Sequence, residues 1–360
     1  MRFVGPVRNF YGRYERPISS FFLFFGFVLD GLTLKRVDSL FENVVIFSYL
    51  LIIGTFIILI HLKESEEGGE KNPGSAHFWY VNILQFAFGG VFSAFLVLYF
   101  RSADIFVAWP FIVLLLLTFI ANEFLKKHYI RLSFQISLFF LSIFWFSIFL
   151  VPVILRKIGP EIFLLSGIVS LAVITLFILI LFRFTKDKLA KSKKLIILLI
   201  SSVLILVNFL YFTNLIPPIP LSLKDGGVYH SIKKTNNGYE VTFEDLGWSR
   251  FFKLYPDYNK ALGEPVYAFS AVYSPKDLDM TIVHEWQRYD EKKKWVTESI
   301  VDLSVVGGRD GGFRTYSMRT NPKPGKWRVN VKTERGQVIG RLRFNVVPAL
   351  EKPMLTTEIK

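Results

Sequence analysis

The sequence predicts an α-helical membrane bundle of about seven transmembrane helices, followed by an all-β, immunoglobulin-like antiparallel sandwich. Residues 17–216 contain seven long apolar runs, whereas residues 225–348 contain almost none. In the second region apolar residues recur with a period of two, which is typical of strands. We therefore divide the chain into a transmembrane domain at 1–216, a proline-rich stalk at 217–224, a β-sandwich domain at 225–348 and a tail at 349–360.

The apolar runs are long enough to cross a bilayer. A spanning helix needs about 18 or more apolar residues to cross a hydrocarbon core of roughly 30 Å, and in lipid a helix satisfies its own backbone groups. The first run opens at Pro17 and contains Asp30. No small-residue cleavage site follows it, so we expect a retained helix and not a signal peptide. We place the spans at residues 18–34, 44–62, 79–100, 105–125, 133–155, 161–183 and 195–216.

The positions of the basic residues predict the orientation in the membrane. Short loops rich in Lys and Arg mark the cytoplasmic side. Residues 183–194, between the sixth and seventh spans, include one arginine and five lysines. We therefore expect a multi-pass protein of the cytoplasmic (inner) membrane, with its N-terminus in the cytoplasm and its β domain outside. The lipid bilayer is then its first partner.

Composition also excludes several classes of function. The net charge of +14 lies largely in the short loops beside the apolar runs, so we expect no nucleic-acid partner. The chain has no cysteine, which rules out disulfides, thiolate zinc sites and thiol nucleophiles. No complete catalytic or metal-binding signature is present. We therefore expect no cofactor, no metal and no catalytic residues, and an enzyme is the less expected class.

Four polar residues inside the predicted spans are candidates for a role within the membrane. Ionisable and amide side chains at membrane depth are costly and often functional. Asp30 either serves such a role or forms a hydrogen bond between helices near the outer boundary. Glu123 either serves it or forms an ion pair at a helix end. The amides most simply join helices to one another. The candidates are Asp30, Gln85, Asn122 and Glu123.

The region after the stalk reads as strands. Residues 266–273 are apolar on both faces, which predicts a central strand, and residues 280–289 and 294–306 predict two more. A hairpin follows with its turn at Gly336. Its inward-facing residues are expected to be Trp327, Val329, Val331, Leu342, Phe344 and Val346.

One segment of the β domain departs from the strand pattern. At residues 244–258 four aromatic residues fall at positions i, i+3, i+4 and i+7, which is one stripe of a helix. The stripe either dips into the membrane interface, where Trp and Tyr are favoured, or packs on the sandwich. The four residues are Trp248, Phe251, Phe252 and Tyr255.

Six residues are candidates for contact with a ligand or partner. A glycine-rich turn at 307–312 lacks the Lys-Ser/Thr of a P-loop, so it either presents a recognition loop or simply reverses the chain. An aromatic-basic stripe on the strand at 280–289 either lines a binding surface or packs. His284-Glu285 lacks the second histidine of a zincin motif, so we expect no zinc there. The six candidates are His284, Trp286, Arg309, Asp310, Arg314 and Tyr316.

These segments resemble a bacterial family called domain of unknown function 2914. The similarity rests on Gly-Gly-Arg-Asp-Gly-Gly-Phe-Arg-Thr-Tyr at 307–316, Pro-Gly-Lys-Trp-Arg-Val at 324–329 and Gly-Arg-Leu-Arg-Phe at 340–344. His284-Glu285-Trp286 fits the family's His-x-Trp position. The resemblance covers about residues 280–346, and the stalk is similar to members that carry a multi-pass membrane region before this domain. The family has no assigned activity, so the resemblance implies a structural class without site residues.

Three functions remain open on the sequence alone. The first is a non-enzymatic membrane protein that presents the β domain to an envelope protein or glycan. The second is a small-molecule transporter or intramembrane enzyme, for which seven spans argue because anchoring needs only one. The second predicts a polar cavity reached by Asp30, Gln85 or Asn122. The third is a sensor that couples the outer domain to the helices.

Overall fold

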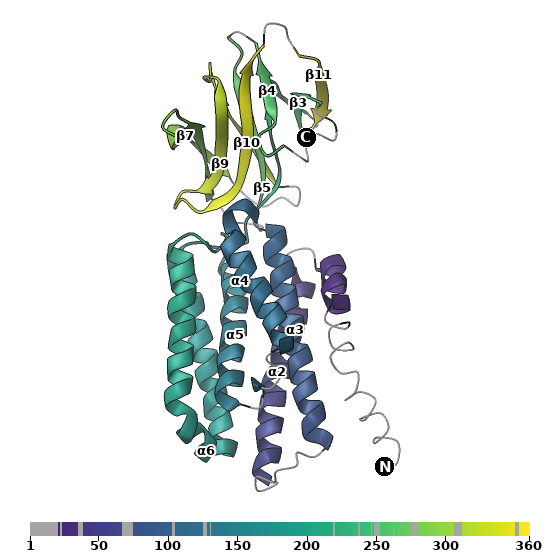
Figure 1. Cartoon of the computed structure of the whole chain (residues 1–360), viewed down its shortest axis with the longest axis vertical. Coiled ribbons are helices and arrows are strands. Elements are labelled where there is room, and N and C mark those ends of the chain that lie inside the picture. Colours follow the sequence, from purple (N-terminus) through teal and green to yellow (C-terminus); the bar gives the residue numbers. More distant parts are fainter. Residues whose placement is uncertain are drawn as a thin grey trace. The chain divides into compact units, whose positions relative to one another are not determined.

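The chain forms two compact units, one helical (Met1–Arg101 and Ala108–Ile216) and one β-rich (Pro217–Lys360, with the short segment Ser102–Val107). Each is described by itself, from a computed structural model (Figure 1). The structure describes residues 21, 24–34, 39–66, 75–102, 105–124, 128–129, 131–218, 220–236, 238–245, 247, 253–261, 263–274, 280–305, 312–349 and 353–360.

Apolar helices make up the described part of the helical unit. Four of them are long and apolar enough to cross a membrane, namely α2, α3, α5 and α6. The helices follow the predicted spans closely, because each apolar run is helical over most of its described length. They are Phe24–Thr33, α2 (Leu40–Glu66), α3 (Ser75–Ser102), α4 (Ile105–Phe124), α5 (Leu132–Leu155) and α6 (Pro160–Phe212).

Helix α6 is a hairpin of two antiparallel arms. Its 53 residues leave the helical conformation at Thr185, with φ −139° and ψ 42°. The rings of Phe163 and Tyr211, near its two ends, stack with their centroids 3.7 Å apart. A straight helix of this length would separate its ends by about 80 Å. The two arms lie side by side in Figure 1 and correspond to the predicted sixth and seventh spans, although the predicted link at 184–194 is helical apart from Thr185.

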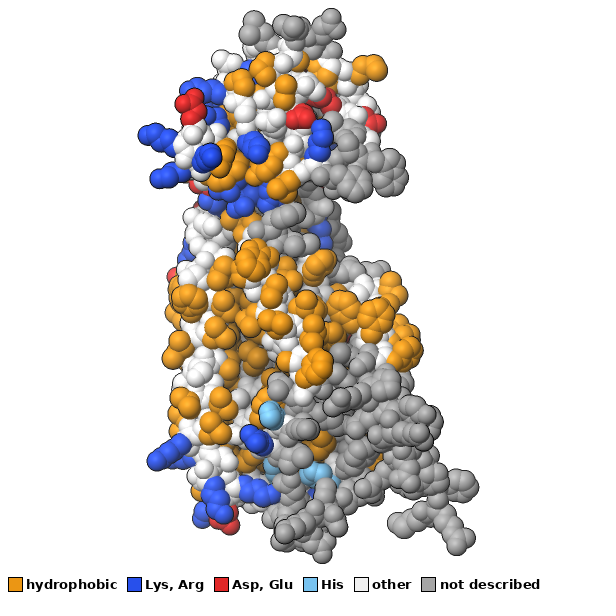
Figure 2. Space-filling model, in the orientation of Figure 1, with side chains coloured by type: hydrophobic (Ala, Val, Ile, Leu, Met, Phe, Trp, Pro, Cys, Tyr) orange, Lys and Arg blue, Asp and Glu red, His pale blue; other side chains and the backbone are white. Residues whose placement is uncertain are grey.

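The surface of the helical unit is largely apolar. Figure 2 shows hydrophobic side chains across most of this face of the helices, and Lys and Arg side chains at the end where α6 reverses. Exposed residues include Phe86, Trp109, Leu176 and Leu198. Exposing an apolar surface of this size to water is unfavourable. Such a surface is typical of helices solvated by lipid.

The β unit has eleven described strands in three sheets. The first sheet orders β1 (Ser222–Tyr229), β5 (Val266–Tyr273) and β8 (Phe313–Arg319). The second orders β4 (Asp257–Lys260), β10 (Val338–Pro348), β9 (Gly325–Thr333), β6 (Met280–Tyr289) and β7 (Trp295–Val305). The third orders β11 (Leu355–Ile359), β3 (Gly238–Glu244) and β2 (Ser231–Thr235).

The first sheet lies between the other two. Ser270 of β5 contacts His284 of β6 across one interface, and Phe269 of β5 packs on Tyr239 of β3 across the other. Strand β5 therefore needs apolar side chains on both faces, which explains its sequence pattern. The predicted hairpin is confirmed, with Gly336 at φ +84° in the turn between β9 and β10. Its six predicted inward residues are buried.

Three details differ from the sequence prediction. Strands β4 and β10 pair in parallel, so the β unit is not purely antiparallel. The predicted tail contains β11, which pairs with β3 through its backbone although its side chains are exposed and show no burial pattern. The predicted stalk is shorter, because β1 already begins at Ser222 and pairs with Tyr273 of β5.

Candidate functional site

Two of the predicted contact residues lie inside the β unit. His284 and Trp286 of β6 are both 0% exposed. The hydroxyls of Ser270 and Ser317 lie 2.8 Å from the two ring nitrogens of His284, and the indole N–H of Trp286 donates to Ser317 at 2.9 Å. Burial lowers the pKa of His284 to about 4, so its ring is neutral at pH 7. The predicted surface stripe is therefore wrong for these two residues, and the packing alternative holds.

Two of the other predicted contact residues, Arg314 and Tyr316, lie in β8. Arg314 is half-buried and donates from Nη1 to the backbone oxygen of Lys360 at 2.9 Å, so it fastens the last strand. Tyr316 is 38% exposed, and its ring lies 5.9 Å from that of Tyr239. Arg309 and Asp310 lie outside the described residues.

The polar residues of the helical unit contact one another. Asp30 accepts a hydrogen bond from Ser93 of α3, as the inter-helix alternative predicted. The side-chain amides of Gln85 and Asn122 donate to each other's backbone oxygens at 3.4 and 3.2 Å. Tyr129 donates to the side-chain oxygen of Asn122. The amides thus join α3 to α4. The helical position of Glu123 is described, but its side chain is not.

A groove of about 860 Å³ lies in the β unit. It gathers residues that are far apart in the sequence: the end of β1, the end of β3, the start of β4, the middle of β10 and the end of β11. Aromatic rings and charged groups of both signs line it. The lining segments are 226–230, 243–245, Gly247, 253–254, 256–258, 341–344, Glu358 and Lys360.

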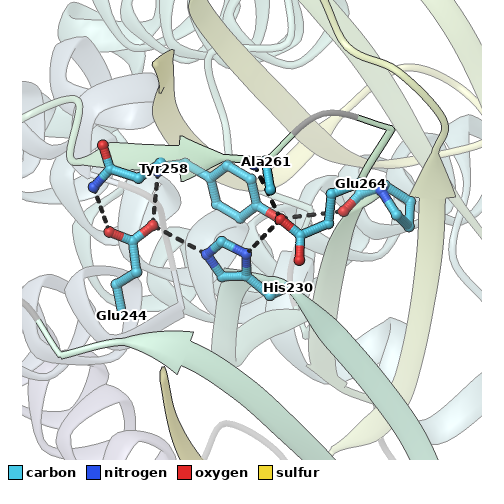
Figure 3. A network of polar contacts seen from close by, with 7 residues as sticks. His230, Glu244, Tyr258, Ala261 and Glu264 are labelled. Carbon is cyan, nitrogen blue, oxygen red and sulfur yellow. Dashed lines mark hydrogen bonds and ion pairs between the residues drawn. The ribbon is translucent and has the colours of Figure 1, made fainter. Parts of the chain in front are cut away.

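A buried histidine forms part of the groove wall. The Nε2 atom of His230 lies 3.0 Å from Glu244 Oε1, and its Nδ1 atom lies 3.4 Å from Glu264 Oε2 (Figure 3). The ring stacks on that of Tyr258, with centroids 4.2 Å apart. Both ring nitrogens of His230 thus face carboxylate oxygens.

The carboxylates of Glu244 and Glu264 also accept hydrogen bonds from groups other than His230. Glu244 accepts hydrogen bonds from the backbone and side-chain nitrogens of Asn259, at 2.7 and 2.6 Å. Glu264 accepts one from the backbone nitrogen of Ala261 at 3.2 Å. The network therefore ties the β1–β2 turn to β3, β4 and the loop after β4. It gives the groove a rigid wall.

Charged pairs line the rest of the groove. Lys253 contacts Asp257 at 3.1 Å, and hydrogen bonds from Asn345 and Lys253 lower the pKa of Asp257. Lys360 contacts Glu358 at 3.3 Å. Among the described residues no cluster of three or more His, Asp or Glu side chains could hold a metal ion. A walled groove with aromatic and charged groups is suited to binding a polar ligand.

Sequence reasoning missed this groove. Its lining comes from five separate segments, and none carries a recognisable motif. One local signal was present, the Gly226-Gly227 pair inside β1. Glycine within a strand often marks close approach of another group. A Cβ atom at Gly226 would lie 2.8 Å from Leu342 Cδ2, so the leucine side chain would have to shift to accommodate it.

The predicted aromatic stripe is only partly described. Trp248, Phe251 and Phe252 lie outside the described residues. Tyr255 is in a bend, not a helix, and its ring stacks on Trp295 at 6.2 Å with an interplanar angle of 16°. Tyr255 therefore packs on the outer face of the five-stranded sheet, in agreement with the packing alternative for this residue.

Comparison with solved structures gives weak similarities. A β-glucosidase from Listeria innocua in complex with gluconolactone aligns at 12% identity and a TM-score of 0.19, over 34% of this chain and 16% of its own length. The Pseudomonas fluorescens alkylpurine DNA glycosylase AlkC, bound to DNA containing an abasic site analog, aligns at 9% identity and a TM-score of 0.23. That alignment covers 87% of this chain and 100% of the glycosylase. Scores of this size do not indicate a shared fold.

Comparison with families is more specific. No curated protein matches the chain. One family, described as Protein of unknown function (DUF2914), matches residues 279–346. The match begins just before β6 and ends within β10, so it covers the strands that carry the buried His284 and Trp286 and the arginines of the groove. The C-terminal part of this chain therefore contains a region similar to DUF2914, a domain of unknown function.

Proposed function

We propose that the chain is a multi-pass protein of the bacterial cytoplasmic membrane whose β unit lies outside that membrane and binds a protein or glycan of the cell envelope. Four helices long and apolar enough to span a membrane support the membrane assignment. The groove of the β unit supports the binding role. The proposal is non-enzymatic, because the described groove residues combine into no nucleophile–base pair suited to a defined reaction.

Seven spanning helices and a cytoplasmic N-terminus belong to the same proposal. The two arms of α6 would supply the sixth and seventh spans, with α2, α3, α4, α5 and the helix at Phe24–Thr33 supplying the others. The lysines at the reversal of α6 would then face the cytoplasm. An immunoglobulin-like sandwich is supported by the face-to-face packing of the first sheet on the five-stranded sheet, although the third sheet and the parallel β4–β10 pair depart from it.

The binding role is supported by a difference between the two units in how accessible their polar groups are. The groove has an open, charged and aromatic lining. In the helical unit, the described candidates Asp30, Gln85 and Asn122 all form hydrogen bonds with neighbouring helices. Satisfied polar groups in a bundle stabilise helix association. An accessible polar surface in the β unit is better placed to recognise a partner.

Photo-crosslinking in cells tests this proposal. Leu254 lines the groove and is 51% exposed, so a benzoylphenylalanine at this position would leave the core intact. The matched control is the same replacement at Lys292, an exposed residue of the β6–β7 turn that does not line the groove. We expect a reproducible protein or glycan adduct from position 254 that is absent from position 292. Equal yields from both positions would contradict a groove-specific partner.

Labelling of introduced cysteines tests the orientation. The chain contains no cysteine, so Lys292→Cys and Lys191→Cys each create a single reactive thiol. In cells with a permeabilised outer envelope and an intact cytoplasmic membrane, a membrane-impermeant maleimide should label position 292 and not position 191. Labelling of position 191 alone would place the β unit in the cytoplasm and reject the proposal.

A second candidate function, transport or chemistry within the bundle, rests on a smaller hollow. This cavity of about 260 Å³ is lined by Asn122 and Tyr129 and otherwise mainly by apolar side chains such as Phe92 and Leu138. Replacing Asn122 with Leu would remove its polar side. Loss of a transport phenotype in that variant, with normal groove crosslinking, would favour the bundle as the functional part.

A further inference from the structure

The groove runs along one edge of strand β1. In the first sheet, β1 pairs with β5 on one side and is the outermost strand on the other. Residues 226–229 of β1 and the residue that follows them, His230, all line the groove. Gly226 and Gly227 have no side chains, so their backbone atoms form this part of the lining. The wall of the groove is therefore made partly of main chain.

The register of β1 shows which backbone groups face the groove. Gly227 is the partner of Phe269 in β5. A Cβ atom at Gly226 would lie 3.3 Å from the backbone oxygen of Phe269, which places that oxygen between the two strands. Successive residues of a strand turn their backbone groups to alternate edges. The N–H and C=O groups of Gly227 therefore point to β5, and those of Gly226 and Val228 point to the opposite edge.

The open part of this edge is short and has two defined ends. At one end, the backbone nitrogen of Gly226 donates to Asp225 Oδ1 at 2.8 Å. At the other, the backbone nitrogen of His230 donates to the backbone oxygen of Thr242 in β3 at 2.8 Å. Between these ends, no group of the described residues bonds to the C=O of Gly226 or to the N–H and C=O of Val228 from the groove side. One backbone donor and two acceptors are thus available to a ligand.

The two glycines leave room beside this edge for a second backbone. Neighbouring strands of a sheet lie about 4.8 Å apart, and glycine within a strand often marks close approach of another chain. Large side chains on an added strand fit opposite Gly226 and Gly227, because they meet no side chain on β1. Residues 226–229 also contain no charged residue and no proline, which are the usual protections of an edge strand.

Other sheet edges of the β unit differ from this one. Strand β4 is only four residues long, and β2 presents the exposed side chains of Lys233 and Lys234. Short length and lysine both hinder the addition of a strand. Of the described residues in β7 and β8, none lines the groove. The edge of β1 therefore combines an accessible main chain with a groove that can hold a ligand.

The charges of the groove suit a ligand that is neither a polyanion nor a polycation. Apart from His230, the described lining contains four acidic and four basic side chains. Complementarity of charge favours a partner that likewise carries both signs, as the side chains of a polypeptide do. The eight charged residues are Glu244, Asp245, Asp257, Glu358, Lys253, Arg341, Arg343 and Lys360.

We infer that the ligand of the groove is an extended peptide segment of a partner protein, which pairs with the edge of β1 as an added strand. Residues 226–229 span about 13 Å, so the edge accepts a segment of roughly four or five residues. In this mode of recognition the backbone hydrogen bonds supply affinity and the alternate side chains supply specificity. The inference rests on the proposed binding role of the β unit and names a protein, not a glycan, as its partner.

Replacing Val228 with proline tests the inference in cells. Val228→Pro removes the N–H that points into the groove, and proline is tolerated in an edge strand where the N–H points away from the neighbouring strand. Val228→Ala keeps this N–H and removes most of the side chain, so it is the matched control. We expect the adduct from position 254 to be a protein, to persist in Val228→Ala and to fall about tenfold or more in Val228→Pro, which loses a hydrogen bond and gains a blocking ring. Hydrogen exchange of peptides from β5 checks that both variants are folded.

A peptide selection tests the same edge outside the cell. Random peptides displayed on phage are selected against the full-length protein in maltoside micelles, and the binding of enriched peptides is measured by fluorescence anisotropy. The second variant is an ester analogue in which the α-hydroxy acid of valine replaces Val228, so that the N–H is lost and the side chain is kept. We expect enriched peptides that bind the wild type and Val228→Ala alike, bind the ester analogue about tenfold more weakly, and slow amide exchange in β1.

The two experiments separate the inference from the proposed function. A glycan adduct, or equal adduct yields in folded Val228→Pro and Val228→Ala, would overturn strand addition while the binding role of the groove stands. Equal binding of the selected peptides to the wild type and the ester analogue would overturn it as well, even if Val228→Pro proves unfolded. If the peptides depend on the N–H of Val228 but no groove adduct forms in cells, strand addition stands and the envelope-binding function fails.

Discussion

Arg328 of β9 and Arg343 of β10 face each other directly across two antiparallel strands. Cross-strand partners lie with their Cβ atoms about 5 Å apart, so two guanidinium groups share a small area of surface. Gln287 and Trp295 orient the Arg328 guanidinium through a 2.7 Å hydrogen bond and a ring centroid 4.2 Å away. Two like charges directly opposite each other on neighbouring strands oppose the stability of the sheet.

Removal of one member of this pair should not weaken the fold. We expect Arg343→Gln to raise the free energy of unfolding of the β unit by about 0.2–1 kcal/mol at low ionic strength, because it removes a like-charge contact. The gain should shrink in 0.5 M salt, which screens exposed charges. Amide hydrogen exchange of peptides covering β9 and β10 measures the effect. A loss of protection in the variant would show that Arg343 is structural.

The buried His284 should make the β unit sensitive to mild acid. Burial lowers its pKa from the ordinary 6.5 to about 4, so the unfolded chain takes up a proton at higher pH than the folded chain does. Between about pH 6.5 and pH 4 protonation therefore favours unfolding, and this contribution to stability is lost as the pH falls. The full effect is roughly 3 kcal/mol.

His284→Gln removes this titration and keeps a polar side chain between the two serine hydroxyls. Between pH 6.5 and pH 4, the unfolding free energy of this variant should change less than that of the wild type. The difference between the two changes is the contribution of His284. Hydrogen exchange of peptides from β6 at several pH values provides the comparison. Identical pH profiles for the two proteins would refute the assignment of acid sensitivity to His284.

The hydroxyl of Ser317 forms hydrogen bonds with two buried side chains, so its removal should leave both without a partner at that position. Ser317→Ala leaves the indole N–H of Trp286 and one ring nitrogen of His284 without this hydrogen bond. Each buried polar group left unpaired costs about 1–3 kcal/mol. Ser304→Ala, at an exposed position of β7, is the control and should change stability by less than about 0.5 kcal/mol. Equal effects of the two substitutions would contradict the buried network.

The hairpin form of α6 can be tested with a pair of cysteines in a chain that has none. Phe163→Cys with Tyr211→Cys places the two thiols where the wild-type rings stack. Mild oxidation should link them, so that fragments cut by trypsin in the lysine-rich reversal stay joined until reduction. The control pair, Phe163→Cys with Thr185→Cys, lies at opposite ends of one arm and should release its fragments. A straight α6 would give free fragments in both cases.

The sequence predicted elements well where one physical pattern dominated. Long apolar runs located the helices, because lipid-facing and core-facing residues are both apolar. The alternation at 327–331 and 342–346 located the hairpin and its buried face, because each inward residue packs against a second sheet. Strand β11 escaped prediction because its pairing uses the backbone and its side chains are exposed.

The candidate site was less predictable because it depends on tertiary contacts. His284 and Trp286 looked like a surface stripe, since alternation does not reveal which polar side chains have hydroxyl partners on another sheet. His230 and Glu244 come together only through the turn after β1 and the end of β3. Arg328 and Arg343 alternate along their strands with the predicted inward-facing residues, and they lie on the outer face. Their direct opposition depends on the hairpin register, which the turn at Gly336 sets.

The most direct test of the account combines the groove probe with the two arginines that line the groove, Arg341 and Arg343. Benzoylphenylalanine at position 254 would be crosslinked in cells in the wild-type background, in the double variant Arg341→Gln with Arg343→Gln, and in Arg335→Gln as the control. The account predicts the same adduct in the wild type and in Arg335→Gln, and its loss in the double variant. Equal adduct yields in all three proteins, each shown to be folded by hydrogen exchange, would contradict it.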